Sequence, residues 1–242
     1  MNHKPTLNNE ILEKFMNGFF GYGNWNADIW FVGMEEGGGN SIDEIRNRMN
    51  SWDKRGRRNL EDVYEYHKDI KTGMKFFREK PALQNTWNKL IRIFLSIKEA
   101  PSDTEDVRNY QSSEWGRLSG ETCLIELFPL PSPSASKWFY RDYSTLSFLI
   151  NRTIYKHHLY RDRSEAIRFK IKEHQPSKVI FYGLGYKDFW EGIVGKPFNQ
   201  NGNQDVLTAA EAATSFYVIP HPAAKGKTNE DFENIGRHIK NN

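Results

Sequence analysis

The sequence predicts an α/β protein with a mainly parallel sheet, and two observations support this class. Four short apolar runs have the continuous hydrophobic character of strands that are buried on both faces. Segments with helical spacing separate these runs, as expected where helices connect parallel strands. The predicted strands are 27–32, 122–128, 178–185 and 215–224.

Helical periodicity recurs before, between and after the predicted strands. Asn8 or Asn9 is a candidate N-cap for the first of these segments, and Ser164 for the fourth. The second segment begins after Pro81, a residue that favours the first turn of a helix. The predicted helices are 6–20, 82–99, 143–160, 164–174 and 229–240.

The remaining segments set the domain organisation. Residues 40–72 are polar and charged, with helical spacing but little apolar material for a core. We expect one domain over 1–242, with 40–72 as a partly helical insertion over the end of the first strand. The prolines of "PLPSPSASK" should end the second strand at Phe128, because proline cannot continue a central ladder.

Composition excludes several classes of protein. A single cysteine, Cys123, rules out a disulfide within the chain and a cysteine-held zinc or iron–sulfur cluster. No apolar run has membrane-spanning length, and the polar N-terminus does not resemble a signal peptide. We therefore expect a cytoplasmic protein with no membrane partner, no metal and no cofactor.

Positive charge is concentrated in two places, although the formal net charge is only +3. These are "DKRGRR" at 53–58 and the tract 152–172. Such clusters can follow a phosphate backbone. The alternative is a charged, solvated helix face.

The ends of the predicted strands carry groups suited to acid–base chemistry. Glu35 and Glu36 follow the first strand, Glu126 lies in the second, and His221 ends the fourth. Ligands of parallel sheets bind at the carboxyl ends of strands, so these groups are expected to surround one crevice. Each alone also has an ordinary explanation as an ion-pair partner or a turn residue.

Four motifs, in this order, resemble those of the uracil-DNA glycosylase superfamily, nearest to its single-strand-selective monofunctional branch. "GMEEG" (33–37) is similar to the first motif, and "GMKFFREKPALQNTWNKL" (73–90) to the segment that carries a base-stacking phenylalanine. "LIELFPL" (124–130) resembles the second-strand motif, and "HPAA" (221–224) the His-Pro motif. The resemblance implies a three-layer α/β/α sandwich with a central four-stranded, mainly parallel sheet.

The resemblance also implies an activity, which is hydrolysis of the bond between a flipped base and its deoxyribose by a monomer on duplex or single-stranded DNA. His221 would donate to O2 of the leaving base, and Glu35 would hold the attacking water and stabilise the sugar cation. The implied base-binding residues are Met34, Gly37, Phe76 (or its neighbour Phe77), Glu126 and Phe128. The implied contacts to the DNA backbone are Ser132, Ser134, Lys137, Lys225 and Lys227.

Three departures from the family motifs bear on the substrate. Glu35 replaces an Asn of the nearest branch, and Glu36 replaces a Pro. Glu126 stands in place of the Asn that reads uracil; both forms of a carboxyl group suit cytosine, whereas only the neutral form also serves uracil. Glycines at 37–39 leave no side chain against C5 of the base. We therefore expect a C5-modified cytosine as the target, with hypermodified phage DNA and host defence as the setting.

Other interpretations remain open at this point. One alternative is an enzyme that removes uracil or 5-substituted uracils in base-excision repair. Another is a protein that binds DNA or a modified base without turnover. A third interpretation is a different α/β enzyme in which "EGGGN" binds phosphate. The sequence, however, contains neither of the two common glycine-rich phosphate-binding signatures. The loop "AAKGKTN" (223–229) offers no large apolar wedge for base extrusion, so Trp52 in the 40–72 segment is an alternative wedge.

Overall fold

The computed structural model describes residues 6–134, 136–200 and 202–242. Within them, one mixed sheet of eight strands has the order β3-β1-β4-β2-β5-β8-β7-β6. The strands are β1 (Gly21–Gly23), β2 (Ile29–Gly37), β3 (Leu60–Glu61), β4 (Thr122–Ser132), β5 (Lys178–Tyr182), β6 (Asn199–Gln200), β7 (Leu207–Glu211) and β8 (Thr214–Ile219). The predicted α/β class is confirmed, and the sheet is larger than the four strands expected.

The predicted strands occupy the middle of this sheet. β2 pairs in parallel with β4 on one side and with β5 on the other, and β5 pairs in parallel with β8. The added strands lie outside: β1 is antiparallel to β4, and β7 is antiparallel to β8. The middle strands are therefore the ones whose apolar runs could be read from the sequence.

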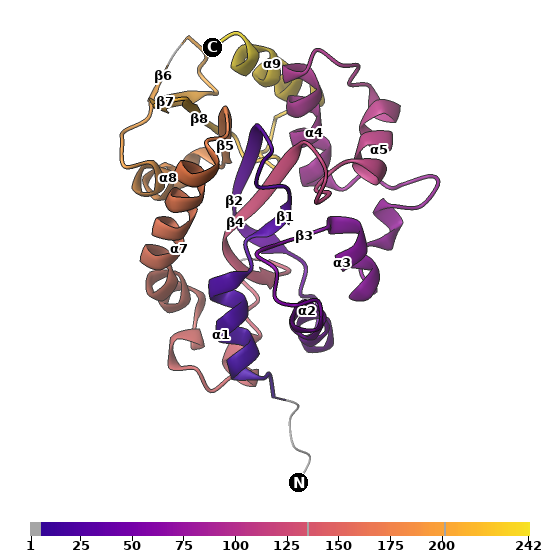
Figure 1. Cartoon of the computed structure of the whole chain (residues 1–242), viewed down its shortest axis with the longest axis vertical. Coiled ribbons are helices and arrows are strands. Elements are labelled where there is room, and N and C mark those ends of the chain that lie inside the picture. The colour runs from indigo at the N-terminus through magenta and orange to yellow at the C-terminus, as the bar shows by residue number, and fades with distance from the viewer. Residues whose placement is uncertain (1–5, 135, 201) are drawn as a thin grey trace.

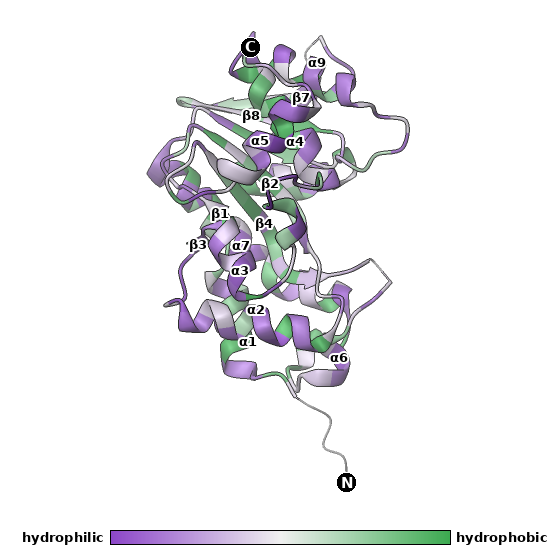
Figure 2. Cartoon of the chain, turned by 90° about the vertical axis from the view of Figure 1, so that its right-hand side faces the viewer, coloured by the Kyte–Doolittle hydropathy of each residue, from purple (hydrophilic) through white to green (hydrophobic). Residues whose placement is uncertain are grey.

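Helices cover both sides of the sheet. Figure 1 shows α7 and α8 on one side and α4, α5 and α9 on the other. Figure 2 shows hydrophobic strands in the interior and hydrophilic residues on the outer helix surfaces. The α-helices are α1 (Asn9–Gly18), α2 (Ile42–Lys54), α3 (Val63–Asp69), α4 (Asn85–Ile97), α5 (Thr104–Ser113), α6 (Tyr140–Tyr143), α7 (Arg152–His174), α8 (Lys187–Val194) and α9 (Asn229–Lys240), with short 3-10 turns at Met74–Phe76, Ser147–Leu149 and Leu184–Tyr186.

Local chemistry explains where several helices begin. The Asn8 side chain caps α1 by accepting from the Ile11 amide, as the sequence predicted. A capping box between Thr228 and Asp231 starts α9. Within α4, every residue from Leu90 to Ile97 is buried, and this helix packs against α9 and α5. No helix in the described ranges is both long and apolar enough to cross a membrane.

Two predicted boundaries are wrong. The helices expected at 143–160 and 164–174 are largely one helix, α7, in which Ser164 is a buried interior residue and not a cap. The second strand does not stop at Phe128 but continues through Pro129 and Pro131. β1 covers the edge of β4 only as far as Ile125, so both prolines lie where that edge has no neighbouring strand.

The 40–72 segment is part of the core, contrary to the expectation of little apolar material. It forms α2, β3 and α3, and its apolar side chains are spaced along these elements. Those buried in the core are Ile45, Met49, Trp52, Leu60, Val63, Tyr66 and Ile70. Trp52 is only 1% exposed and its indole N–H donates to the Arg58 carbonyl at 2.7 Å, so it is not available as a wedge.

Trp52→Ala should therefore lower the free energy of unfolding by about 3–5 kcal/mol, since it empties a large buried site against Phe15. Lys54→Ala, at an exposed position of the same helix, should change it by less than about 0.5 kcal/mol. Urea unfolding of the two variants gives the comparison. Similar values for both would mean that the segment is not part of the cooperative core.

Candidate functional site

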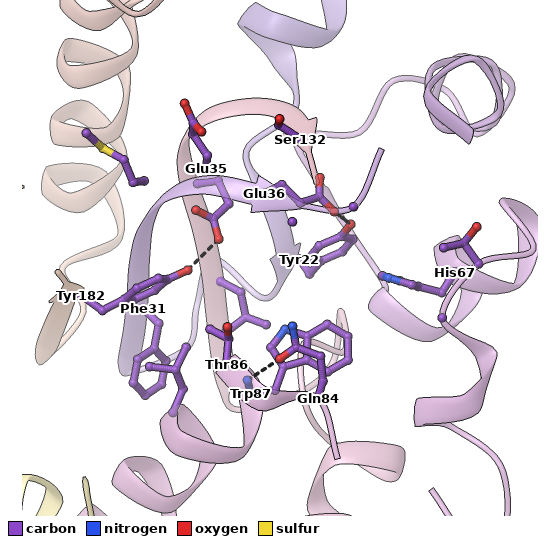
Figure 3. Close-up of a pocket in the computed structure, with 18 of the residues that line it drawn as sticks. Tyr22, Phe31, Glu35, Glu36, His67, Gln84, Thr86, Trp87, Ser132 and Tyr182 are labelled. Atoms are coloured by element: carbon purple, nitrogen blue, oxygen red, sulfur yellow. Dashed lines mark hydrogen bonds between the residues drawn. The ribbon is translucent and has the colours of Figure 1, made fainter. Parts of the chain in front are cut away.

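A cavity of about 780 Å³ lies beside the carboxyl-terminal parts of β2, β4 and β5. Glu35, Glu36, Glu126 and His221 all line it, so the predicted strand-end groups do come together. Other predicted residues on its wall are Met34, Gly37, Phe76, Ser132 and Ser134. Figure 3 shows Glu35 and Glu36 along the upper edge of this space, with Tyr182 at one side and His67 at the other.

Glu126 is half-buried in the cavity wall and hydrogen-bonded to a residue that the sequence did not single out. The Tyr182 hydroxyl, at the end of β5, donates to Oε1 of Glu126 at 2.6 Å. Oε2 is buried and has no hydrogen-bond partner among the described residues. Burial, together with nearby Glu36 and Glu35, raises the pKa of Glu126 to about 8, although the Tyr182 bond opposes this rise.

Gly33 makes this contact possible. Glu126 on β4 is the direct partner of Gly33 on β2, and β5 lies on the other side of β2. A Cβ atom at Gly33 would collide with both the Tyr182 hydroxyl and Oε2 of Glu126. The glycine therefore lets two side chains from flanking strands meet across the middle strand.

The raised pKa of Glu126 predicts a pH dependence of stability. Between pH 4.5, the ordinary pKa of the group, and about pH 8, its pKa in the folded protein, the folded protein binds more protons than the unfolded chain. Stability should therefore fall as pH rises through this window, by on the order of 4 kcal/mol, and level off above it. Glu126→Gln keeps the acceptor for Tyr182 but does not titrate. Urea unfolding from pH 5 to 9 should show a flatter profile for this variant; equal slopes would contradict the assignment.

Glu35 is held by two cations from the start of α7. Its Oε2 lies 3.0 Å from an Arg152 nitrogen, and its Oε1 lies 2.9 Å from Nζ of Lys156. All three side chains are largely buried and line the cavity. Two carboxylate oxygens have about four acceptor sites, so Glu35 keeps capacity to hold a water molecule.

Arg152 also organises the serine–proline loop after β4. Its guanidinium donates to the Ser132 hydroxyl and to the carbonyls of Ser134 and Lys137, the last two at 2.7 and 2.9 Å. The Ser132 hydroxyl itself donates within the loop. This loop was expected to touch DNA, and the structure ties it to Glu35 through one arginine.

Glu36 belongs to a separate buried network. Its Oε1 accepts from Arg48 of α2 at 2.6 Å and from the Tyr22 hydroxyl of β1. Its Oε2 is buried without a hydrogen-bond partner in the described ranges. Arg48 is almost fully buried and also contacts Glu44, so one guanidinium serves two carboxylates.

His221 has a defined donor atom. Its Nδ1 accepts from the Ala223 amide at 3.0 Å, so the neutral ring carries its proton on Nε2. His221 is exposed at the rim of the cavity, and the partial desolvation of its ring there lowers its pKa below the ordinary value of 6.5, which favours this neutral form. The ring lies edge-on to Tyr182, with centroids 5.8 Å apart. A neutral imidazole N–H therefore lies near the Glu126–Tyr182 pair.

The opposite wall of the cavity is aromatic. Phe76 lies edge-on to Trp87 at 5.7 Å, and Phe77, the alternative stacking residue, lies behind them outside the lining. His67 is buried there, 5.9 Å from Trp87. Burial, then the charge of Arg48, lowers the pKa of His67 to about 3, so the ring is neutral.

Several predicted contacts lie elsewhere. Phe128 is fully buried and packs against Tyr155 and Phe189, outside the lining. Lys137 and Lys225 are exposed outside the cavity, and Lys227 is paired with Asp205 at 2.7 Å.

The three glycines after Glu36 differ. A Cβ at Gly37 would meet open space, whereas one at Gly38 would meet Arg48 and one at Gly39 the Pro131 carbonyl. Only the first of the three therefore leaves the wall open as expected.

The positive clusters are largely used internally. Arg55 pairs with Glu61 and Asp69, and Arg57 with Asp53. In α7, Arg163 is buried and donates to the carbonyls of Glu126 and Leu127. Neither cluster thus forms a single phosphate-binding face.

The structure adds Tyr182, Arg48, His67, Arg152 and Lys156 to the site. The sequence offered weak signals for Tyr182, at the end of a buried strand, and for Arg152 and Lys156, one helical turn apart. Across the described residues, no group of three or more His, Cys, Asp and Glu side chains is placed to hold a metal ion. No protein-family model matches the chain, and no curated protein matches it either.

Proposed function

We propose that the protein is a monofunctional DNA glycosylase that hydrolyses the N-glycosidic bond of a flipped pyrimidine, with a C5-modified cytosine as its base. The observation that supports this most is the meeting of Glu35, Glu126 and His221 in one cavity with an aromatic wall. A flipped base needs such a wall for stacking, and its edge needs polar groups for recognition. We propose that it acts as a monomer in the cytoplasm, against phage DNA.

The chemistry follows from the atoms available. The Nε2–H of His221 donates to O2 of the base, where negative charge develops as the bond from C1′ to the ring nitrogen breaks. Water held by Glu35 forms the new bond to C1′ and gives its proton to that carboxylate. The base leaves as an anion and is then protonated, so the products are a free base and an abasic site.

Glu126 would read the base in its neutral form. Because Tyr182 donates to Oε1, the acid proton is favoured on Oε2. Oε2–H then donates to N3 of cytosine, and the second lone pair of Oε1 accepts from N4–H₂. Uracil requires the opposite placement of the proton, which the Tyr182 bond disfavours.

Arg152 and Lys156 fit a role toward the phosphate of the flipped nucleotide. The positive charges of Arg152 and Lys156 would oppose the positive charge that develops on the sugar, unless an anion balances the two side chains. A backbone phosphate bound by both, next to the serine–proline loop, provides that charge. Glu35 is then freed toward C1′ when DNA binds.

The proposal is tested on a panel of duplex and single-stranded DNAs that carry cytosine, uracil, 5-substituted cytosines or 5-substituted uracils. Alkali cleavage reveals abasic sites, and we expect them with 5-substituted cytosines. Release of uracil-type bases alone would favour a repair enzyme.

A second candidate, a modified-base binding module without turnover, is favoured by one observation, the pairing of both Glu35 oxygens with cations. It predicts selective binding without abasic sites.

A further inference from the structure

The cavity is much larger than one pyrimidine ring. Its volume of about 780 Å³ falls in the range of about 300–1,000 Å³ that holds drug-sized ligands. Figure 3 shows it extending from Tyr182 at one side, past Tyr22, to His67 at the other, with Gln84 and Trp87 along the lower edge. We call the part formed by Glu36, His67, Phe76, Gln84 and Trp87 the side compartment.

The side compartment contains two acceptor atoms that have no donor. Nδ1 of His67 bonds the Val63 carbonyl at 2.7 Å, and a carbonyl only accepts, so Nδ1 carries the proton and Nε2 has a lone pair. His67 lines the cavity, and nothing in the described ranges donates to that Nε2. Oε2 of Glu36 is buried and unpartnered, because Arg48 and Tyr22 both bond Oε1. A buried acceptor left unpaired is costly, so a ligand with O–H or N–H donors is favoured here.

The compartment also has groups suited to the rest of such a ligand. Phe76 and Trp87 are half-buried and offer aromatic surface for C–H groups. The Gln84 side-chain oxygen caps α4 by accepting from the Trp87 amide at 2.7 Å, which leaves its NH₂ group as a donor. Polar groups on one side and aromatic carbon on the other match the two kinds of surface on a sugar ring.

Charge decides against other substituents. Arg48 and Lys75 balance Glu36 and Glu44 in the lining, so neither a cationic nor an anionic substituent gains net attraction. A methyl group would offer no donor to Oε2 of Glu36 or to Nε2 of His67. A neutral group with several hydroxyls meets all of these conditions.

We propose that the side compartment binds a neutral sugar that is attached to the target base. This rests on the proposed function, because the base of the same nucleotide would occupy the part of the cavity beside Glu126 and His221. Gly37 lines the cavity, and a Cβ there would meet only open space, so no side chain at that position closes the wall. The chemical class of substrate is thus a glycosylated pyrimidine in DNA.

The test uses duplex oligonucleotides that differ at one base only. That base is cytosine, 5-methylcytosine, 5-hydroxymethylcytosine or 5-hydroxymethylcytosine glucosylated on its hydroxyl. Under single-turnover conditions, we expect the glucosylated base to be released about 100-fold or more faster than the 5-hydroxymethyl base, since only the sugar supplies donors to both Glu36 and His67. Affinity for the same oligonucleotides is measured by fluorescence anisotropy.

Variants then locate the effect. Trp87→Leu and His67→Phe should each reduce the preference for the glucosylated base about tenfold or more, measured as the ratio of its release rate to that of the 5-hydroxymethyl base. Phe77→Leu is the matched control, since Phe77 touches the same aromatic cluster at 5.9 Å from Trp87 but does not line the cavity. Circular dichroism checks that each variant folds. If one of the two compartment variants does not fold, the other still tests the preference.

The outcomes separate this inference from the proposed function. Equal release of glucosylated and 5-hydroxymethyl bases would overturn the inference and leave the glycosylase proposal standing. Tight, Trp87-dependent binding of the glucosylated oligonucleotide without release of any base would support the compartment and overturn the glycosylase proposal. If the glucosylated base is neither released nor bound selectively, the inference is overturned.

Discussion

Glu35→Gln is expected to lower the rate of base release by about 100-fold or more, with little change in DNA affinity. The amide keeps the shape of the side chain but cannot take a proton from water or balance a sugar cation. Arg152 and Lys156 remain to bind phosphate, which is why affinity should persist. The rate of base release is measured under single-turnover conditions, and the DNA affinity by fluorescence anisotropy on the same oligonucleotide.

His221→Ala should have an effect of similar size, because it removes the donor to O2 of the leaving base. Glu230→Gln, at an exposed position of α9 outside the cavity lining, is the control and should behave as wild type. If both site variants keep near-normal rates on a proven substrate, the catalytic assignment is wrong. Loss of affinity together with rate would indicate misfolding.

Glu126→Asn is expected to shift activity from cytosine-type toward uracil-type bases by about 10–100-fold. An amide donates to O4 and accepts from N3–H, and one bidentate contact to a base discriminates by about 1–3 kcal/mol. The shorter side chain also loses the Tyr182 bond that biases the proton of Glu126. The ratio of release rates for 5-substituted cytosine and 5-substituted uracil measures the shift.

Glu126→Gln is the matched control for this switch. It keeps the length of the side chain and an acceptor for Tyr182, and it places NH₂ where Oε2–H stands, so cytosine-type release should persist. Wild type should slow in cytosine-type release above about pH 8, because ionised Glu126 still accepts from N4–H₂ but no longer donates to an unprotonated N3, and this variant should not slow there. An unchanged base ratio in Glu126→Asn would remove Glu126 from base recognition.

The middle of the fold could be predicted because buried parallel strands consist of continuous apolar residues. β2, β4, β5 and β8 were all located this way, and α9 was predicted with its observed bounds. β1 could not be, since "GYG" has no strand pattern and two of its three residues are glycines with positive φ. Its pairing with β4 depends on a partner about a hundred residues away.

In the site, too, some residues could be predicted from the sequence and others could not. Glu35, Glu126 and His221 could be singled out because each lies in or next to a predicted strand, and strand order brings them together. Tyr182 and Arg48 could not, because their roles arise from contacts across strands and helices. Glu126 meets Tyr182 only because Gly33 leaves room between them. The 40–72 segment was misread since its core residues are diluted among charged ones.

Mass spectrometry of a single-turnover reaction decides whether the protein cleaves the N-glycosidic bond of a modified cytosine. Wild-type protein is incubated with a duplex carrying one glucosylated 5-hydroxymethylcytosine, and small products and strands are both analysed. We expect a free modified base and a strand that has lost that base but kept its backbone. Release of a nucleoside or nucleotide, or an unchanged strand that stays bound to the protein, would contradict it.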